Sequence, residues 1–158
     1  MDIATSKPKE FDAAALMTDL RRWSVELGFA RLGVAQLDLA QDEAHFLDWL
    51  RAGFNGEMAY MARHGLRRTR PAELLPGTVS CVSVRMDYWP EHAADAAATL
   101  DDRSVAYISR YALGRDYHKL MRARLQQLCD RSKSAVGPFV HRVFTDSAPV
   151  LEKALARN

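Results

Sequence analysis

Apolar residues near the start of the chain recur at intervals of three or four, the spacing of one face of a helix. The pattern is carried by Phe11, Leu16, Leu20, Trp23 and Leu27. Gly28 follows directly, where glycine commonly ends a helix, so the pattern predicts a first helix over about residues 11–27. A short apolar run then predicts a strand over 29–37, and a return to helical spacing predicts a helix over 42–50.

The second half of the chain alternates apolar runs with helical patterns. Residues 79–88 form a continuous apolar stretch, typical of a strand covered on both faces, and we expect it at the centre of a sheet. Further strands are predicted over 105–112 and 138–146, and helices over 116–132 and from 147 onwards. Alternating strands and helices predict an α/β fold or α+β sandwich, with a central mixed sheet flanked by helices.

Two stretches between these elements have a different character. Residues 53–77 carry four glycines between short helical pieces and contain a basic cluster that includes Arg67, Arg68 and Arg70. Such a cluster either holds phosphates of RNA or a cofactor, or forms a solvated basic face. Residues 90–103 are rich in small and acidic residues and predict a surface loop or a short helix.

Composition limits the classes of protein. At 158 residues the chain predicts one domain, and 22 Lys plus Arg against 20 Asp plus Glu give no general preference for nucleic acid or membranes. The two cysteines, Cys81 and Cys129, have no spacing typical of a disulfide framework, a zinc site or an iron-sulfur cluster. With no secretory signal and no apolar run of about 20 residues, we expect a soluble protein of the cytoplasm.

Common catalytic motifs do not occur. The sequence contains no G-x-S-x-G, P-loop or G-x-G-x-x-G motif, which removes the usual signals of serine hydrolases, P-loop proteins and Rossmann enzymes. Aromatic residues offer a weaker signal, because they either fill the core or stack on a planar ligand. The tyrosines open to both interpretations are Tyr107, Tyr111 and Tyr117.

Asp116, Tyr117 and His118 stand at the start of a predicted helix. Asp116 occupies the position where a carboxylate caps a helix, so capping explains it without any further function. Asp-x-His also begins the D-x-H-x-x-G pattern of one cobalamin class, but Met121 stands where that pattern requires glycine. A histidine ligand to cobalt at His118 is therefore not expected.

Asp146 ends the predicted strand 138–146, and ligands in open α/β sheets usually bind where strands end. Partial burial of its carboxyl would favour the protonated form that a general acid needs. The alternative is that Asp146 or Ser147 caps the helix that follows.

Four blocks in order resemble the N-terminal domain of epoxyqueuosine reductases: "GFNGEMAYMARH", "RPAELLPGTVSCVSVRMDY", "ISRYALGRDYHKLMRARL" and "FTDSAPVLEKALA". Enzymes of this family reduce epoxyqueuosine to queuosine at the wobble position of tRNAs with GUN anticodons. The resemblance implies a fold similar to reductive dehalogenases and flavin nitroreductases, with cobalamin bound base-off. Residues 1–158 would form the N-terminal cobalamin- and substrate-binding domain of a monomer.

The resemblance also implies roles for individual residues. Asp146 matches the proposed proton donor of the family, and the "GRDYH" block lies near the family's active site. The residues implied in the cofactor pocket are Asp116, Tyr117, His118 and Lys153. Those implied in contact with tRNA or cofactor phosphates are Arg67, Arg68 and Arg70.

Two departures from the family pattern matter. Lys153 stands where an arginine is common, and lysine cannot make the same planar bidentate contact. The family continues into further cobalamin contacts and a ferredoxin-like domain that holds two 4Fe-4S clusters, which residues 1–158 do not ligate. We therefore expect the isolated chain to be inactive. The alternatives are a non-catalytic RNA-binding module on the same fold and a flavin-binding reductase.

Overall fold

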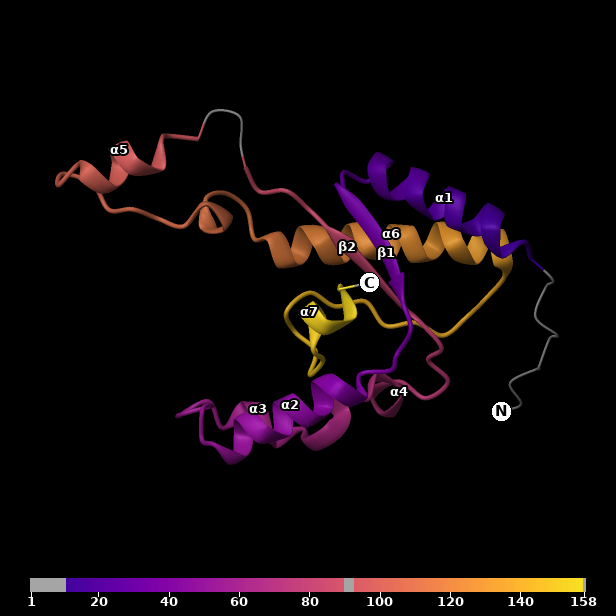
Figure 1. The fold of residues 1–158 in the computed structure, drawn as a ribbon. Helices are drawn as coiled ribbons and strands as arrows, with labels where there is room; N and C mark the ends of the chain where they lie inside the picture. Colours follow the sequence, from indigo (N-terminus) through magenta and orange to yellow (C-terminus); the bar gives the residue numbers. More distant parts are fainter. Residues whose placement is uncertain (1–10, 90–92, 158) are drawn as a thin grey trace.

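The computed structural model describes residues 11–89 and 93–157. Figure 1 shows short helices arranged around a small sheet. The elements in chain order are α1 (Ala13–Glu26), β1 (Arg31–Ala35), α2 (Ala40–Arg51), α3 (Tyr60–Arg63), η1 (Gly65–Arg68), α4 (Pro71–Leu74), β2 (Cys81–Arg85), α5 (Ala96–Asp101), η2 (Arg110–Ala112), α6 (Tyr117–Val136) and α7 (Glu152–Leu155).

Helix α1 confirms the first predicted helix. The carboxylate of Asp12 accepts hydrogen bonds from the backbone N–H groups of Ala14 and Ala15, at 2.8 and 3.2 Å, and so caps the start of the helix. Gly28 has φ +77°, a left-handed conformation that allows the chain to turn from α1 into β1. The predicted helices at α2 and α6 and the short helical pieces over 53–77 are confirmed as well.

The sheet differs from the predicted one. Within the described residues it has two strands, β1 and β2, paired antiparallel with Gly33 opposite Ser83. The prediction of a central strand in a mixed sheet is wrong for this part of the chain. The predicted strands 105–112 and 138–146 are also wrong, because residues 110–112 form η2 and the other positions have no strand structure. An apolar run becomes a strand only where a second strand edge supplies hydrogen bonds, and neither run has one here.

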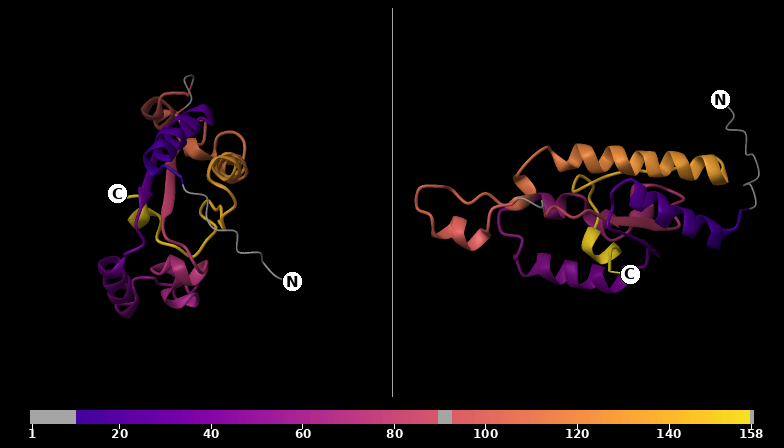
Figure 2. Two further views of the ribbon diagram at one scale, coloured as in Figure 1. Left: turned by 90° about the vertical axis from the view of Figure 1, so that its right-hand side faces the viewer. Right: turned by 90° about the horizontal axis from the view of Figure 1, so that it is seen from above.

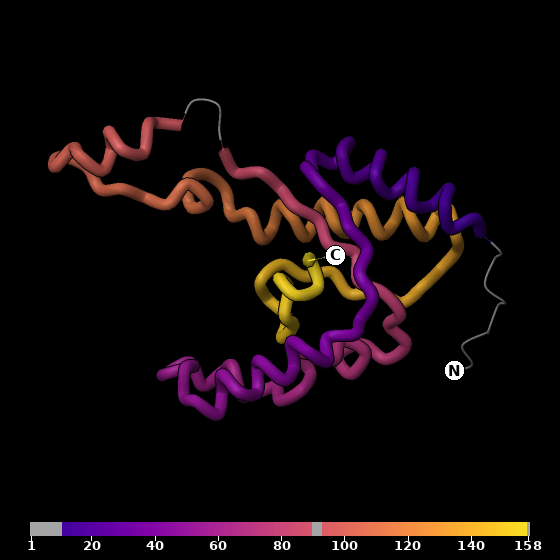
Figure 3. Tube along the Cα trace, in the orientation of Figure 1, coloured from indigo at the N-terminus to yellow at the C-terminus, as the bar shows by residue number. Residues whose placement is uncertain are grey.

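Two separate apolar clusters replace a single core. The first joins α1, the residues just before β1, and α6 through Leu20, Phe29 and Leu128. The second joins the segment after β1 to the end of the chain through Leu39, Val150, Ala154 and Leu155. Figure 3 follows residues 137–151 from the far end of α6 back to the middle of the molecule, where Phe144 packs in the second cluster with Cys81 of β2.

Helices surround the sheet on several sides, and one segment projects away from it. Figure 2 shows α6 and α2 on opposite sides of the strands, while α5 lies on an arm that extends from the rest of the molecule. Where this arm leaves β2, Trp89 is 71% exposed and carries the guanidinium of Arg110 at 3.6 Å from its ring centroid. None of the described helices combines the length and the apolar character needed to cross a membrane.

Candidate functional site

Asp116 caps helix α6, as its position predicted. Its carboxylate accepts a hydrogen bond from the backbone N–H of His118 at 3.0 Å, and the same oxygen lies 3.0 Å from Nδ1 of the His118 ring. The hydrogen bond to the His118 ring is the main reason that the pKa of Asp116 is lowered. Capping and orientation of His118 are therefore two roles of one carboxylate.

Asp146 is brought to the start of α6 by residues 137–151, the segment that runs back from the end of α6. The Tyr117 hydroxyl donates a hydrogen bond to Oδ2 of Asp146 at 2.5 Å, across 29 positions of sequence. The backbone of Asp146 has φ +53°, and its N–H donates to the Glu152 carboxylate at 3.0 Å. A left-handed backbone is uncommon outside glycine, although aspartate and asparagine adopt it more readily than other residues, and here two neighbouring side chains hold it.

Three expectations about Asp146 are wrong in this structure. Because 138–146 is not a strand, Asp146 does not stand at a strand end. It does not cap the following helix either, since α7 begins at Glu152 and has no side-chain cap. Nor is its carboxyl buried, because the side chain is 52% exposed. The acid lies on an outward-facing turn where a ligand can reach it.

His118 lies between the two aspartates. Its Nε2 is 3.6 Å from Oδ2 of Asp146, and its Nδ1 is 3.0 Å from Asp116. The Tyr117 and His118 rings stack with centroids 4.0 Å apart, and Tyr111 meets Tyr117 edge-on at 6.1 Å. Tyr111 is 57% exposed and Tyr107 43%, so the interpretation of these two as core residues is wrong. The cluster places an acid, a phenol and an imidazole within proton-transfer reach on the surface.

Glu152 belongs to this cluster and was not predicted as a site residue. Burial is the main reason that its pKa is raised, and the charge of Asp146 adds to the effect. Next to the acid, the buried Thr145 hydroxyl has no hydrogen-bond partner among the described residues. Lys153 is exposed on α7, one residue beyond Glu152. The only sequence signal for Glu152 was its place in the quoted "FTDSAPVLEKALA" block.

The Tyr117 hydroxyl is expected to ionise unusually late. Its pKa is raised from 10.0 to about 12, mainly because Asp146 accepts its hydrogen bond and also through partial burial and the charge of Asp146. The stabilising contact is therefore complete below about pH 10 and is lost as the pH rises through about 12. An absorbance titration of tyrosinate should lose its last step in Tyr117→Phe.

In Asp146→Asn the same step should move down towards the usual value of 10.0, because the carboxylate charge is lost and the neutral amide is a weaker acceptor. Tyr88→Phe, which removes an exposed tyrosine elsewhere, should leave the last step in place. A last step that stayed unchanged in Tyr117→Phe would show that the Tyr117–Asp146 hydrogen bond is not formed in solution.

The three arginines of the basic stretch occupy different environments. Arg68 is 8% exposed, and its guanidinium donates to the backbone carbonyls of Tyr60 and Met61, each at 2.9 Å. Arg70 pairs with Glu43 at 2.7 Å, and the hydrogen bond from Arg70 is the main reason that the pKa of Glu43 is lowered to about 2. Arg67 is exposed and has no ion pair with any described residue.

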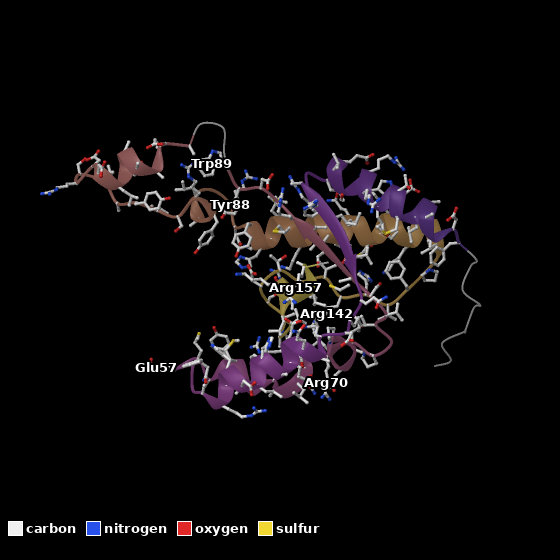
Figure 4. The ribbon with its side chains drawn as sticks, viewed as in Figure 1. Glu57, Arg70, Tyr88, Trp89, Arg142 and Arg157 are labelled. Carbon is white, nitrogen blue, oxygen red and sulfur yellow. The ribbon has the colours of Figure 1, made fainter. Side chains whose placement is uncertain are left out.

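A backbone hydrogen bond connects the basic stretch with the segment that carries Asp146. The carbonyl of Arg68 accepts a hydrogen bond from the backbone N–H of Leu151 at 3.0 Å, five positions beyond Asp146. Figure 4 shows Arg70 beside α4 and far from Tyr88 and Trp89, which lie where the arm leaves β2. Arg70 therefore lies on a different side of the molecule from the exposed Tyr88 and Trp89.

The surface beside this cluster is open and partly apolar. Exposed apolar side chains of Tyr111, Leu113 and Leu120 stand near the start of α6, and they are 57%, 51% and 41% exposed. These side chains offer apolar contact to the face of a flat ring system. Two hollows of about 300 and 360 Å³ lie elsewhere, against the start of α2. Among the described residues, no group of three His, Cys, Asp or Glu is arranged to hold a metal ion.

Comparison with known proteins gives consistent matches. The family model described as "Epoxyqueuosine reductase QueG, DUF1730" matches residues 68–147, which include Asp116, Tyr117, His118 and Asp146. An epoxyqueuosine reductase of Pseudomonas aeruginosa is 54% identical over 145 residues, covering 92% of this chain and 40% of the relative. No solved structure gives a significant match.

Further relatives carry the same name. One from Xanthomonas campestris is 52% identical over 158 residues, covering 100% of this chain and 44% of the relative, and one from Escherichia coli is 47% identical over 145 residues, covering 92% and 38%. The chain thus spans about two fifths of the length of these curated relatives. With just over half of its residues matched by the family model and this level of identity, the chain belongs to the epoxyqueuosine reductase QueG family.

Proposed function

We propose that residues 1–158 are the N-terminal cobalamin- and substrate-binding domain of an oxidoreductase that converts epoxyqueuosine to queuosine in tRNA. The observation that carries the proposal is the Asp146 carboxyl on an outward-facing turn, held by Tyr117 and Glu152. A general acid must reach the substrate oxygen while its own position is fixed, and this turn meets both requirements. The proposed fold class is that of reductive dehalogenases and flavin nitroreductases.

The chemistry assigned to Asp146 is protonation of the epoxide oxygen. As a carbon–oxygen bond of the epoxide breaks, negative charge develops on the oxygen, and a proton from the Asp146 carboxyl neutralises it. Tyr117 donates to Oδ2 of the same carboxyl and fixes its orientation. The mechanism therefore needs the protonated form of Asp146 at the moment of bond cleavage.

Base-off cobalamin would supply the electrons for this reduction. The residues proposed to contact it are Asp116, Tyr117 and His118, next to the exposed apolar side chains at the start of α6, and Lys153 on α7. In the full-length protein, two 4Fe-4S clusters would deliver electrons from outside residues 1–158. The isolated chain is therefore proposed to bind ligands without completing turnover.

The proposed macromolecular substrate is tRNA with a GUN anticodon, met by a monomer in the cytoplasm. Of the three arginines proposed to contact RNA, Arg67 is the one whose exposed guanidinium is open to a phosphate. Arg70 would have to exchange Glu43 for phosphate, and Arg68 is held by backbone carbonyls. Arg67 is thus the best placed for a direct contact.

The function is tested in a bacterial strain that lacks epoxyqueuosine reductase. The protein, expressed at the full length of its relatives, is expected to restore queuosine in tRNA, measured by mass spectrometry of digested nucleosides. Accumulated epoxyqueuosine with no queuosine, from a protein shown to be folded and loaded with cobalamin and iron-sulfur clusters, would contradict the proposal. Binding of tRNA without conversion would instead favour the RNA-binding module.

A further inference from the structure

The removal of an epoxide oxygen requires two protons, and Asp146 carries one. When an epoxide becomes an alkene, both carbon–oxygen bonds break, a carbon–carbon double bond forms, and the oxygen leaves as water. The balance is two electrons and two protons for each turnover. A single carboxyl must therefore be protonated again before the second bond breaks, or a second donor must act.

His118 is the group placed to supply that second proton. Its Nε2 lies 3.6 Å from Oδ2 of Asp146, a separation that a small shift of either side chain closes to hydrogen-bond distance. Its other nitrogen, Nδ1, is held 3.0 Å from Asp116. A carboxylate can only accept a hydrogen bond, so Asp116 fixes a hydrogen on Nδ1 and leaves Nε2 to exchange a proton with Asp146.

The surroundings of His118 also allow its ring to be protonated again by water. The side chain is 40% exposed, so water can return a proton to Nε2 after each transfer. Stacking of the ring on Tyr117, at 4.0 Å between centroids, limits its rotation away from Asp146. The other charged groups near this cluster are Arg122, whose Nε donates to the His118 carbonyl at 3.3 Å, Lys119, whose charge acts on Asp116, and Glu152, which accepts from the backbone of Asp146.

We infer that His118, oriented by Asp116, is a proton-relay residue that reloads Asp146 with the second proton of each turnover. The inference rests on the proposed function. In the first step the Asp146 carboxyl gives its proton to the epoxide oxygen. The imidazolium of His118 then gives its Nε2 proton to the Asp146 carboxylate and becomes a neutral ring with its hydrogen on Nδ1. The same carboxyl gives this second proton to the oxygen, which leaves as water. The two electrons would be supplied by the cobalamin proposed for the full-length enzyme.

The test measures single-turnover reduction of epoxyqueuosine tRNA by the full-length, cofactor-loaded enzyme. His118→Ala and His118→Gln are both expected to slow the formation of queuosine about 10²-fold or more, because glutamine can hydrogen-bond but cannot carry the proton. Added imidazole should restore the rate of His118→Ala and leave that of His118→Gln unchanged. The exposed His45→Ala, on α2, serves as the matched histidine control and should keep the unmodified rate.

A second readout is independent of activity. Nitrogen NMR should show that, whenever the His118 ring is neutral, its hydrogen is on Nδ1, and Asp116→Asn should weaken that preference. A normal rate in His118→Gln, no recovery with imidazole, or a hydrogen on Nε2 in the neutral ring would each overturn the inference. If the unmodified full-length enzyme forms no queuosine, the proposed function itself fails, and if Asp146→Asn remains fully active, Asp146 is not the acid and the relay to it is wrong. If only the His118 variants are normal, the relay alone is wrong.

Discussion

Asp146→Asn is expected to slow epoxide reduction about 10²- to 10⁴-fold, the usual contribution of a general acid. Asparagine is close in shape to aspartate but has no acidic proton to give. It also tolerates the left-handed backbone at this position, where φ is +53°, so the turn should be kept. The rate is measured in single turnovers of the full-length enzyme, so that product release does not mask the chemical step.

Ser147→Ala is the matched control for this experiment, because it changes the next exposed residue of the same turn. It should leave the rate within a few-fold of the unmodified enzyme. Thermal unfolding of both variants should match, which would separate lost chemistry from lost structure. An Asp146→Asn enzyme with a normal rate would remove Asp146 from the reaction.

Arg68→Ala is expected to destabilise the chain by about 2–4 kcal/mol. The substitution leaves the carbonyls of Tyr60 and Met61 without their buried donor and opens a void where the side chain was. The free energy of unfolding is measured from urea denaturation, with the slope compared between variants. This is the largest effect on stability that the basic stretch should produce.

Arg67→Ala supplies the comparison, since it removes the same charge from the adjacent exposed position. Its effect on the free energy of unfolding should stay within about 0.5 kcal/mol. When both variants are folded, Arg67→Ala should weaken tRNA binding more than Arg68→Ala does, because it removes a phosphate contact. Equal destabilisation by the two variants would contradict the buried arrangement of Arg68.

Local sequence signals predicted the helices well. Helix α1 carries its own information in the apolar spacing, the Asp12 cap and the turn at Gly28, all within a few residues of one another. The Asp116 cap of α6 is of the same kind. Such features depend on neighbours in the chain, so the sequence is sufficient to predict them.

The strands and the site depended on distant partners. Residues 105–112 and 138–146 have strand-like composition, yet no strand edge pairs with them in this part of the protein. The apolar runs alone do not say whether such an edge exists. Family resemblance gave Asp146 its role, but its contact to Tyr117 depends on how residues 137–151 fold back onto α6, which the sequence alone does not predict.

The basic stretch shows the same limit at the level of single residues. Arg67, Arg68 and Arg70 are alike in sequence, and a positive field was the only property that could be predicted from them. Tertiary packing gives them three different environments, with backbone carbonyls around Arg68, Glu43 beside Arg70 and solvent around Arg67. Sequence composition therefore indicated a basic region, and the structure distinguishes the arginines held by the protein itself from the one that is free to contact a phosphate.

The two apolar clusters can form only in a fixed order while the chain is being synthesised on the ribosome. The first cluster closes when Leu128 joins residues from the amino-terminal fifth of the chain, and the second when Leu155 reaches Leu39. Contacts between such distant positions must wait for the later partner to be synthesised. The turn that bears Asp146 is fixed only when the second cluster forms, because Glu152 bonds the backbone of Asp146 and Val150 packs in that cluster. The proposed acid is thus put in position later than the first cluster.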